Sequence, residues 1–276
     1  MNINTTKRLN NGVEMPVLGL GVFRAEDGDE TYNMVTWALE AGYRHIDTAA
    51  VYRNEKSVGD AIADSGIPRK DIFLTTKLWN EDMRQSRQEE GFRNSLELLR
   101  TDYVDLYLVH WPVPGFYVQS WKVLEKLYEQ KHIRAIGVSN FKEHHLETLL
   151  EDSKITPAVN QVECHPLLNQ EDLIRYCDNL DIAVTAWSPL GGGKTDLLKN
   201  PVLVKIGEKY GKNPAQIIIR WDLQRGIIVI PKSSKKERII ENMNVFDFEL
   251  SPGDMSAINA LNKNQRVGSD PDNFSF

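Results

Sequence analysis

The sequence predicts an α/β fold: one (β/α)8 TIM barrel with a small N-terminal β-hairpin capping the barrel floor. The chain has 276 residues, a length typical of a single barrel domain. Eight short apolar segments alternate with amphipathic segments of helical periodicity. A doubly wound sheet usually stops near about six strands, so this count favours a barrel. We therefore expect one domain over residues 1–276.

The eight apolar segments are continuous runs, which indicates parallel strands that are covered on both faces. Ahead of them, the Asn11-Gly12 pair lies between two short polar runs and predicts the turn of the hairpin. The predicted strands are residues 17–21, 44–47, 72–77, 104–110, 133–139, 158–163, 182–187 and 226–231.

The helical segments between the strands begin at recognisable capping residues. Asparagine and serine side chains accept hydrogen bonds from the free N–H groups of a first helical turn. Four helix starts are predicted in this way: Asn54, Asn213 before Pro214, the pair Ser86 and Glu89, and the pair Ser234 and Glu237. The segment after residue 264 is rich in Gly, Pro and Asp, and we expect it to be irregular.

Composition excludes several classes of protein. The net charge is −6 and no long basic run occurs, so nucleic-acid binding is not expected. No apolar run approaches the ~20 residues of a membrane span. Two cysteines without a C-x-x-C motif, and an N-terminal segment without an apolar signal core, predict a cytoplasmic protein. The adjacent His144 and His145 do not share a helix face, so no metal site is predicted.

Candidate catalytic residues follow three consecutive predicted strands. Asp47, Lys77 and His110 stand at the C-terminal ends, where barrels collect their chemistry, and Tyr52 follows Asp47. A tyrosine with an ordinary pKa of about 10 needs a nearby cation if it is to release its proton near neutrality. Lys77 is that cation and Asp47 its partner. The predicted chemistry is protonation of an oxygen while a hydride reaches its carbon, with His110 orienting that oxygen.

A second lysine offers an alternative partner. Tyr52 and Lys56 have the Tyr-x-x-x-Lys spacing with which short-chain dehydrogenases activate a tyrosine. That spacing works only on one continuous helix. If Asn54 caps the helix, Tyr52 lies outside it and Lys56 becomes a surface residue. We therefore interpret the spacing as a coincidence.

Residues 230–242 predict a phosphate site. They join the last strand to a helix start, and Lys232, Ser233 and Arg238 can converge there on a phosphate. Barrels commonly bind phosphate in the loops after strands seven and eight. Two other motifs are incomplete: residues 19–24 lack the last glycine of G-x-G-x-x-G, and residues 188–195 lack the first glycine of a P-loop.

The chain resembles the aldo-keto reductases, in particular their short bacterial members, over almost its whole length. The resemblance implies a barrel that binds NADPH without a Rossmann domain. It is carried by the segments GYRHIDTAAVYRNEKSVG (42–59), KLWN (77–80), DLYLVHWP (105–112), IGVSNF (136–141), NQVECHP (160–166), AWSPLG (186–191) and IPKSSKKERIIEN (230–242).

The resemblance also implies a role for individual residues. Tyr52 is the general acid, completed by Asp47, Lys77 and His110. Trp187 stacks on the nicotinamide ring, and Lys232, Ser233 and Arg238 grip the 2′-phosphate. The implied cofactor contacts are Gly21, Val22, Asp47, Ser139, Asn140, Gln161, Trp187, Ser188, Leu190, Lys232, Ser233, Arg238, Glu241 and Asn242. The implied substrate contacts are Phe23, Trp79, His110 and Trp111.

The sequence departs from larger relatives around the expected substrate site. The connection after His110 and the C-terminal segment are both short, and Phe23 stands where several relatives have tryptophan. We therefore expect a short, open pocket for small aldehydes, ketoaldehydes or keto sugars. The family resemblance also implies a monomer. An NADPH-binding regulatory barrel with little turnover is the alternative, and binding assays alongside turnover assays would separate the two.

Overall fold

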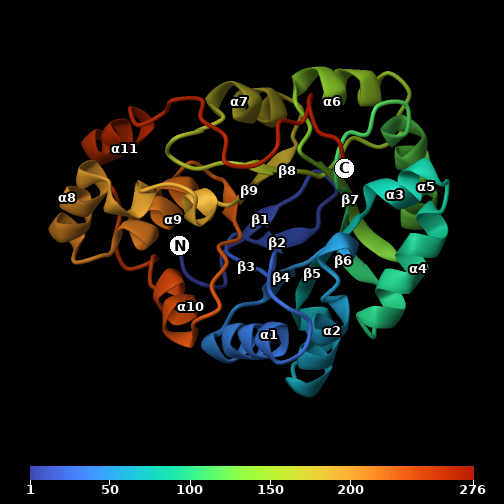
Figure 1. Cartoon of the computed structure of the whole chain (residues 1–276), viewed down its shortest axis with the longest axis horizontal. Helices are drawn as coiled ribbons and strands as arrows, with labels where there is room; N and C mark the ends of the chain where they lie inside the picture. The colour runs from blue at the N-terminus through green and yellow to red at the C-terminus, as the bar shows by residue number, and fades with distance from the viewer.

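Eight parallel strands form the centre of the computed structural model, which describes residues 1–276 (Figure 1). Strands that are consecutive in the sequence are neighbours in the sheet. The two outer strands also meet, because the Gly19 N–H donates to the Val229 carbonyl and the Val229 N–H to the Val17 carbonyl, both at 2.9 Å. The sheet is therefore a closed barrel, as predicted. Its strands are β3 (Leu20–Gly21), β4 (His45–Asp47), β5 (Phe73–Leu78), β6 (Val104–Val109), β7 (Ile133–Ser139), β8 (Val159–Glu163), β9 (Ala183–Trp187) and β10 (Ile228–Val229).

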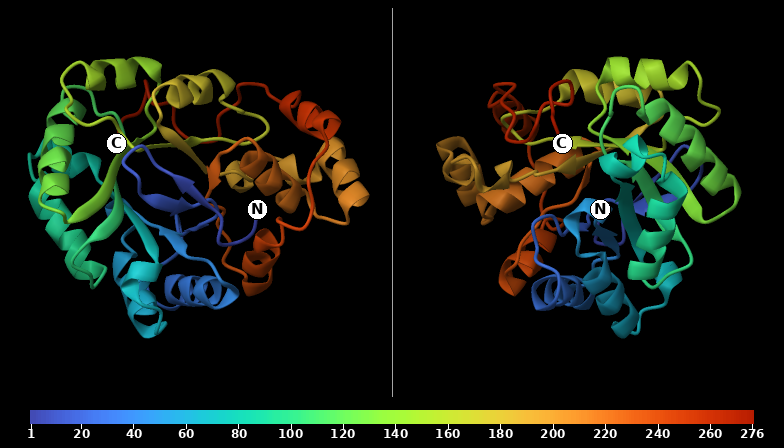
Figure 2. Two further views of the ribbon diagram at one scale, coloured as in Figure 1. Left: turned by 180° about the vertical axis from the view of Figure 1, so that it is seen from behind. Right: turned by 45° about the vertical axis from the view of Figure 1, so that its right-hand side comes forward.

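Helices surround this barrel on the outside (Figure 2). The α-helices are α1 (Asp29–Ala41), α2 (Glu55–Asp64), α3 (Asn80–Arg84), α4 (Gln88–Leu98), α5 (Tyr117–Glu129), α6 (Glu143–Leu150), α7 (Glu171–Asn179), α8 (Pro201–Tyr210), α9 (Pro214–Gln224), α10 (Lys236–Met243) and α11 (Pro252–Asn259). Four single turns of 3-10 helix are η1 (Ala50–Tyr52), η2 (Arg69–Asp71), η3 (Gly191–Gly193) and η4 (Leu197–Lys199).

Successive residues of each strand face opposite sides of the sheet. In β6, Leu106 and Leu108 belong to the apolar cluster inside the barrel, whereas Tyr107 and Val109 belong to the layer between sheet and helices. All four side chains are fully buried. This explains the continuous apolar runs in the sequence, because both faces of each strand are covered.

The predicted hairpin is confirmed, with β1 (Thr6–Arg8) antiparallel to β2 (Glu14–Pro16). Asn10 donates to the Pro157 carbonyl at 3.0 Å and Asn11 to the Arg134 carbonyl at 2.9 Å. Both carbonyls lie near the N-terminal ends of strands, so the hairpin covers the floor of the barrel. Its Met15 is fully buried in the inner cluster.

Two of the four predicted helix starts are displaced. Ser86 has left-handed backbone geometry (φ 55°), which turns the chain after α3, so α4 begins only at Gln88 and the Ser86–Glu89 capping box does not form. Likewise α10 begins at Lys236, without the predicted box at Ser234. Asn213 caps α9 as predicted and accepts a hydrogen bond from the Gln216 N–H at 3.0 Å.

Asn54 stands at the N-cap position of α2, as predicted, but its side chain does not cap the helix. Its amide donates instead to the carbonyls of Val22 at 3.0 Å and Ala25 at 3.1 Å, and its oxygen accepts from Thr48 at 2.9 Å. The side chain is fully buried. Asn54 therefore joins the loops after β3 and β4 beside Tyr52.

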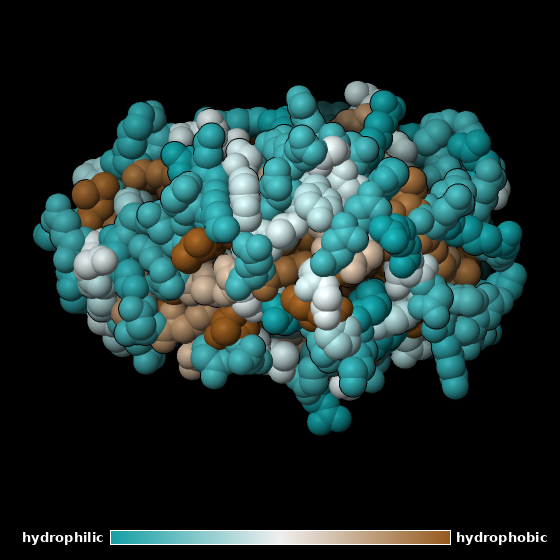
Figure 3. Space-filling view, turned by 90° about the horizontal axis from the view of Figure 1, so that it is seen from below, coloured by the Kyte–Doolittle hydropathy of each residue, from teal (hydrophilic) through white to brown (hydrophobic).

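One face of the molecule is mostly polar. Figure 3 shows one face on which hydrophilic side chains predominate, with smaller hydrophobic patches between them. None of the helices combines the length and the apolar character that crossing a membrane requires.

We expect Asn54→Ala to lower the free energy of unfolding by about 3 kcal/mol, because two buried carbonyls lose their hydrogen-bond donor. Urea denaturation monitored by circular dichroism measures the change. The matched control is Asn213→Ala, which removes one helix cap and should cost about 1 kcal/mol. A loss for Asn54→Ala no larger than that of the control would contradict this role.

Candidate active site

A cavity of about 1310 Å³ opens at the C-terminal ends of the strands. Most of the residues predicted from the sequence line it. They are Gly21, Phe23, Asp47, Tyr52, Trp79, His110, Trp111, Ser139, Asn140, Gln161, Trp187, Ser188, Leu190, Lys232, Ser233, Arg238, Glu241 and Asn242. Lys77 lies directly beneath, with no exposed surface. Val22, predicted as a cofactor contact, is fully buried in the core and does not line the cavity.

Lys77, on β5, gathers the predicted catalytic groups around its ammonium. Its Nζ donates to Asp47 Oδ1 at 2.6 Å and to the Thr48 carbonyl at 2.8 Å. The hydroxyl oxygen of Tyr52 lies 3.4 Å from the same Nζ. The ammonium is thus fixed by one carboxylate and one carbonyl, and it faces the phenol with its remaining hydrogen.

Local backbone geometry explains where Tyr52 lies. The η1 turn ends at Tyr52, and Arg53 then adopts a left-handed conformation (φ 58°) that redirects the chain into α2. The phenol ring packs against Phe23 at 5.0 Å and meets the His110 ring edge-on at 5.8 Å between centroids. Tyr52 is therefore outside the helix that carries Lys56. The Lys56 side chain is 64% exposed and pairs with Asp60 at 2.6 Å.

Burial and the Lys77 charge set the protonation states. Burial disfavours the Lys77 ammonium, but the charges and hydrogen bonds of Asp47 and Tyr52 together outweigh this and raise the Lys77 pKa. Burial also raises the pKa of Tyr52, and Lys77 opposes that shift without cancelling it. Burial, assisted by Lys77, lowers the pKa of His110 well below its ordinary value. Near neutral pH the site thus holds a charged lysine, a protonated tyrosine and a neutral histidine.

Three amide and indole groups meet beside these residues. Asn140, with left-handed geometry (φ 66°), donates to the His110 carbonyl and accepts from Trp187 Nε1, both at 2.9 Å. Gln161 donates to Asp47 Oδ2 at 2.6 Å. The same aspartate therefore binds Lys77 with one oxygen and Gln161 with the other. The hydrogen bond between Trp187 and Asn140 could not be predicted from the sequence, because it joins residues that are distant in the chain, at the ends of β9 and β7.

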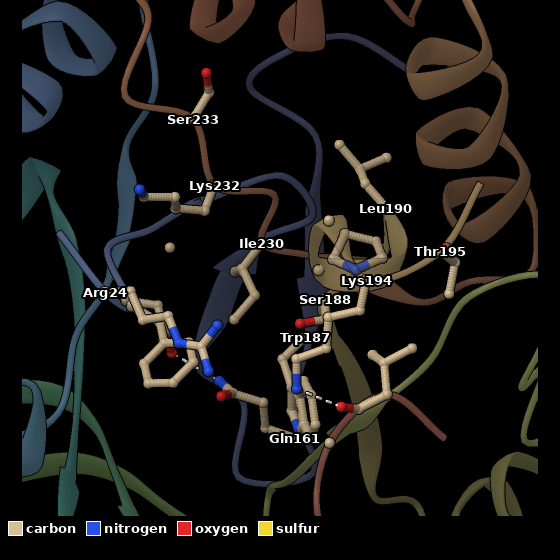
Figure 4. A pocket seen from close by; sticks show the side chains of 18 of the residues that line it. Arg24, Gln161, Trp187, Ser188, Leu190, Lys194, Thr195, Ile230, Lys232 and Ser233 are labelled. Carbon is tan, nitrogen blue, oxygen red and sulfur yellow. Dashed lines mark hydrogen bonds between the residues drawn. The ribbon is translucent and has the colours of Figure 1, made fainter. Parts of the chain in front are cut away.

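Cations line the other end of the cavity. Lys232 and Ser233 follow β10, and Arg238 lies on α10. Arg238 makes no ion pair, and the nearest carboxylate oxygen to Lys232 Nζ, on Glu30, is 3.9 Å away. Figure 4 shows Lys232 and Ser233 on one side of the cavity and Leu190 and Thr195 on the other. Two cations without close acidic partners fit a phosphate group.

Sequence reasoning missed several lining residues. Arg24 comes from the loop after β3, and the others come from the loop after β9 and from the C-terminal segment, among them Lys194, Val267, Gly268 and Phe276. The backbone of Gly268 lies so close to Trp187 that a Cβ atom there would stand 2.4 Å from the indole ring. The irregular C-terminal segment therefore forms one wall of the cavity.

Comparison with known proteins places the chain in a family. The model of the aldo/keto reductase family matches residues 17–263. A 9,11-endoperoxide prostaglandin H2 reductase from Trypanosoma cruzi is 55% identical over 96% of this chain and 94% of its own length. A glyoxal reductase from Bacillus subtilis is 54% identical over 100% of this chain and 99% of its own length. The crystal structure of an aldo-keto reductase from Bombyx mori in complex with NADP superposes with a TM-score of 0.90, at 38% identity, over 97% of this chain and 95% of that one. The chain described here belongs to the aldo/keto reductase family.

Proposed function

We propose that this protein uses NADPH to reduce small aldehydes and ketones to alcohols, with Tyr52 as the general acid. The observation that carries the proposal is the position of Lys77, which is held by Asp47 at 2.6 Å and lies 3.4 Å from the Tyr52 hydroxyl. These groups meet in a cavity of about 1310 Å³, which is large enough for a dinucleotide and a small carbonyl compound.

The proposed reaction needs one hydride and one proton. Reduced nicotinamide supplies the hydride to the carbonyl carbon. Tyr52 releases its hydroxyl proton to the carbonyl oxygen, and the Lys77 ammonium stabilises the phenolate that remains. Neutral His110 donates a hydrogen bond that orients the same oxygen. Asp47 keeps Lys77 charged and in place, so it acts through the lysine.

The arrangement of polar groups supports NADPH as the preferred cofactor. Ser139, Asn140 and Gln161 line the cavity near Tyr52 and suit the nicotinamide carboxamide, with Trp187 beside them as a stacking surface. At the far end, Lys232 and Arg238 suit the 2′-phosphate, whereas an NAD site would present an acid to the ribose hydroxyl. The NADP in the Bombyx mori relative agrees with this assignment.

The proposed substrates are small carbonyl compounds such as methylglyoxal, aromatic aldehydes and keto sugars. A relative at 54% identity is a glyoxal reductase. Phe23, Trp79 and Trp111 give the proposed substrate end an apolar aromatic wall. Both cysteines are free and buried, which supports a reducing, cytoplasmic location. Reduction of such aldehydes would give the protein a role in aldehyde detoxification. We also propose that the protein is a monomer and that residues 1–276 form a single domain.

Tyr52→Phe should lower kcat by at least about 100-fold, because it removes the proton donor and leaves the cavity intact. The assay follows NADPH absorbance with methylglyoxal, benzaldehyde and a keto sugar as substrates. The NADPH dissociation constant, measured by fluorescence, should stay unchanged. A variant with full reductase activity would rule Tyr52 out as the acid. Tight NADPH binding with no turnover in the unmodified protein would favour a regulatory role.

Lys77→Met should abolish activity to a similar extent, because the phenolate loses its stabilising charge. Lys56→Ala should retain near-normal activity, since Lys56 pairs with Asp60 on the surface of α2. Circular dichroism verifies that each variant is folded. An inactive Lys56→Ala variant beside an active Lys77→Met variant would reverse the assignment of the lysine.

Arg238→Ala should weaken NADPH binding by about tenfold, the effect of one lost charge-assisted hydrogen bond. NADH binding should be unaffected, because NADH carries no 2′-phosphate. Lys235→Ala is the matched control, since Lys235 is exposed immediately before α10 but does not line the cavity. If Arg238→Ala weakened the binding of NADPH and NADH equally, Arg238 would not contact the 2′-phosphate.

A further inference from the structure

The C-terminal strap, residues 264–276, contributes an aromatic wall to the cavity. The Phe276 ring stacks on Trp79, with ring centroids 5.9 Å apart and an angle of 8° between the planes. It also meets Trp111 edge-on at 5.1 Å. Trp79 in turn meets the His110 ring at 5.4 Å. The strap therefore reaches the part of the cavity where the proposed chemistry occurs.

Two anchors hold the strap at its ends. Near its start, buried Glu163 accepts hydrogen bonds from the Val267 N–H at 2.6 Å and the Gly268 N–H at 3.1 Å. At its far end, the main-chain oxygen of Phe276 accepts from Asn80 at 3.1 Å and from Arg84 at 2.8 Å. The strap runs from α11 towards α6 and is drawn in red in Figure 1.

Between these anchors, Lys142 ties the strap to α6. Its Nζ donates to Asp270 Oδ1 and to Asp272 Oδ2, both at 2.6 Å. The two aspartates belong to one turn, in which the Asp272 N–H donates to Asp270 Oδ1 at 2.9 Å and the Asn273 N–H donates to the Asp270 carbonyl at 3.0 Å. One ammonium thus fixes the turn that immediately precedes Phe274 and Phe276.

Two histidines approach the same turn. His144 Nε2 lies 3.0 Å and His145 Nε2 3.3 Å from Asp272 Oδ1. The prediction that these adjacent histidines do not share a face is therefore wrong, because both Nε2 atoms approach the same carboxylate oxygen of the strap. The Lys142 N–H donates to His145 Nδ1 at 3.1 Å, so the proton of a neutral His145 ring lies on Nε2. This nitrogen is then a donor to Asp272, which disfavours a metal ion at this place.

We propose that Lys142 is a positioning residue for substrate selection: by holding Asp270 and Asp272 it keeps Phe276 stacked on Trp79, and so favours carbonyl substrates that carry an aromatic group. This inference rests on the active site proposed above. Lys142 touches neither the cavity nor the proposed catalytic groups. Its effect should therefore reach substrate affinity and leave the chemical step unchanged.

The test compares phenylglyoxal with methylglyoxal, two ketoaldehydes that differ by a ring in place of a methyl group. Lys142→Met should raise KM for phenylglyoxal by about fivefold, which corresponds to about 1 kcal/mol. Its KM for methylglyoxal, its kcat and its NADPH affinity should stay within twofold of the unmodified protein, as an order-of-magnitude limit. Lys142→Arg, which retains the charge, should restore the phenylglyoxal KM.

Two further variants separate positioning from general stability. Lys126→Met is the matched control, because it removes a surface ion pair of 2.7 Å with Glu89 on a helix away from the strap. It should leave both KM values unchanged. Phe276→Ala should reproduce the selective loss for phenylglyoxal. In that background Lys142→Met should add nothing, because the two changes act through one contact.

Hydrogen exchange supplies a measurement that does not depend on turnover. Amides of residues 267–276 should exchange faster in Lys142→Met than in Lys126→Met, and the amides of β5 should not change. Equal KM increases for both ketoaldehydes, additive effects with Phe276→Ala, or unchanged exchange in the strap would each overturn the proposal. If the unmodified protein reduced neither ketoaldehyde, the proposed function would fail. In that case exchange alone would decide whether Lys142 holds the strap.

Discussion

The arrangement of the site depends on one buried charge, the ammonium of Lys77. A lysine without exposed surface is costly unless its charge is compensated. Here the compensation comes from Asp47 at 2.6 Å and the Thr48 carbonyl at 2.8 Å, both at the end of the neighbouring strand. Because Asp47 also accepts from Gln161 of β8 at 2.6 Å, the charge links groups from opposite parts of the barrel. The phenol of Tyr52 is then the remaining neighbour of the ammonium.

This charge has its effect because the barrel is closed and its strands are parallel. All the strand ends point to one rim, so residues at or just after the ends of all eight strands surround a single cavity. The hairpin and the inner apolar cluster fill the opposite end. Burial by this scaffold raises the pKa of Tyr52 against the opposing effect of Lys77, and burial and Lys77 together lower the pKa of His110. The packing that closes the barrel therefore also shifts the pKa values of the groups at its rim.

Contacts made by loops are less visible in the sequence. Asn54 has the composition and position of a helix cap, yet its side chain joins the loops after β3 and β4. Ser86 and Glu89 have the spacing of a capping box, but the left-handed turn at Ser86 prevents it. Lys142 meets Asp270 and Asp272 across more than a hundred residues of chain. In each case the tertiary structure set the side-chain contacts or the backbone conformation, and the local sequence pattern did not predict them.

The sequence by itself determined the eight strands, the hairpin, the ends of the strands that carry Asp47, Lys77 and His110, and the choice of Lys77 over Lys56. These follow from hydrophobic periodicity and from the rule that strand ends share a rim, both of which are local or topological. Only the tertiary structure decided that Val22 is buried away from the cavity, that Trp187 donates a hydrogen bond to Asn140, and that Phe276 lines the pocket. These depend on side chains from distant segments that meet in space, and no pattern along the chain encodes their distances.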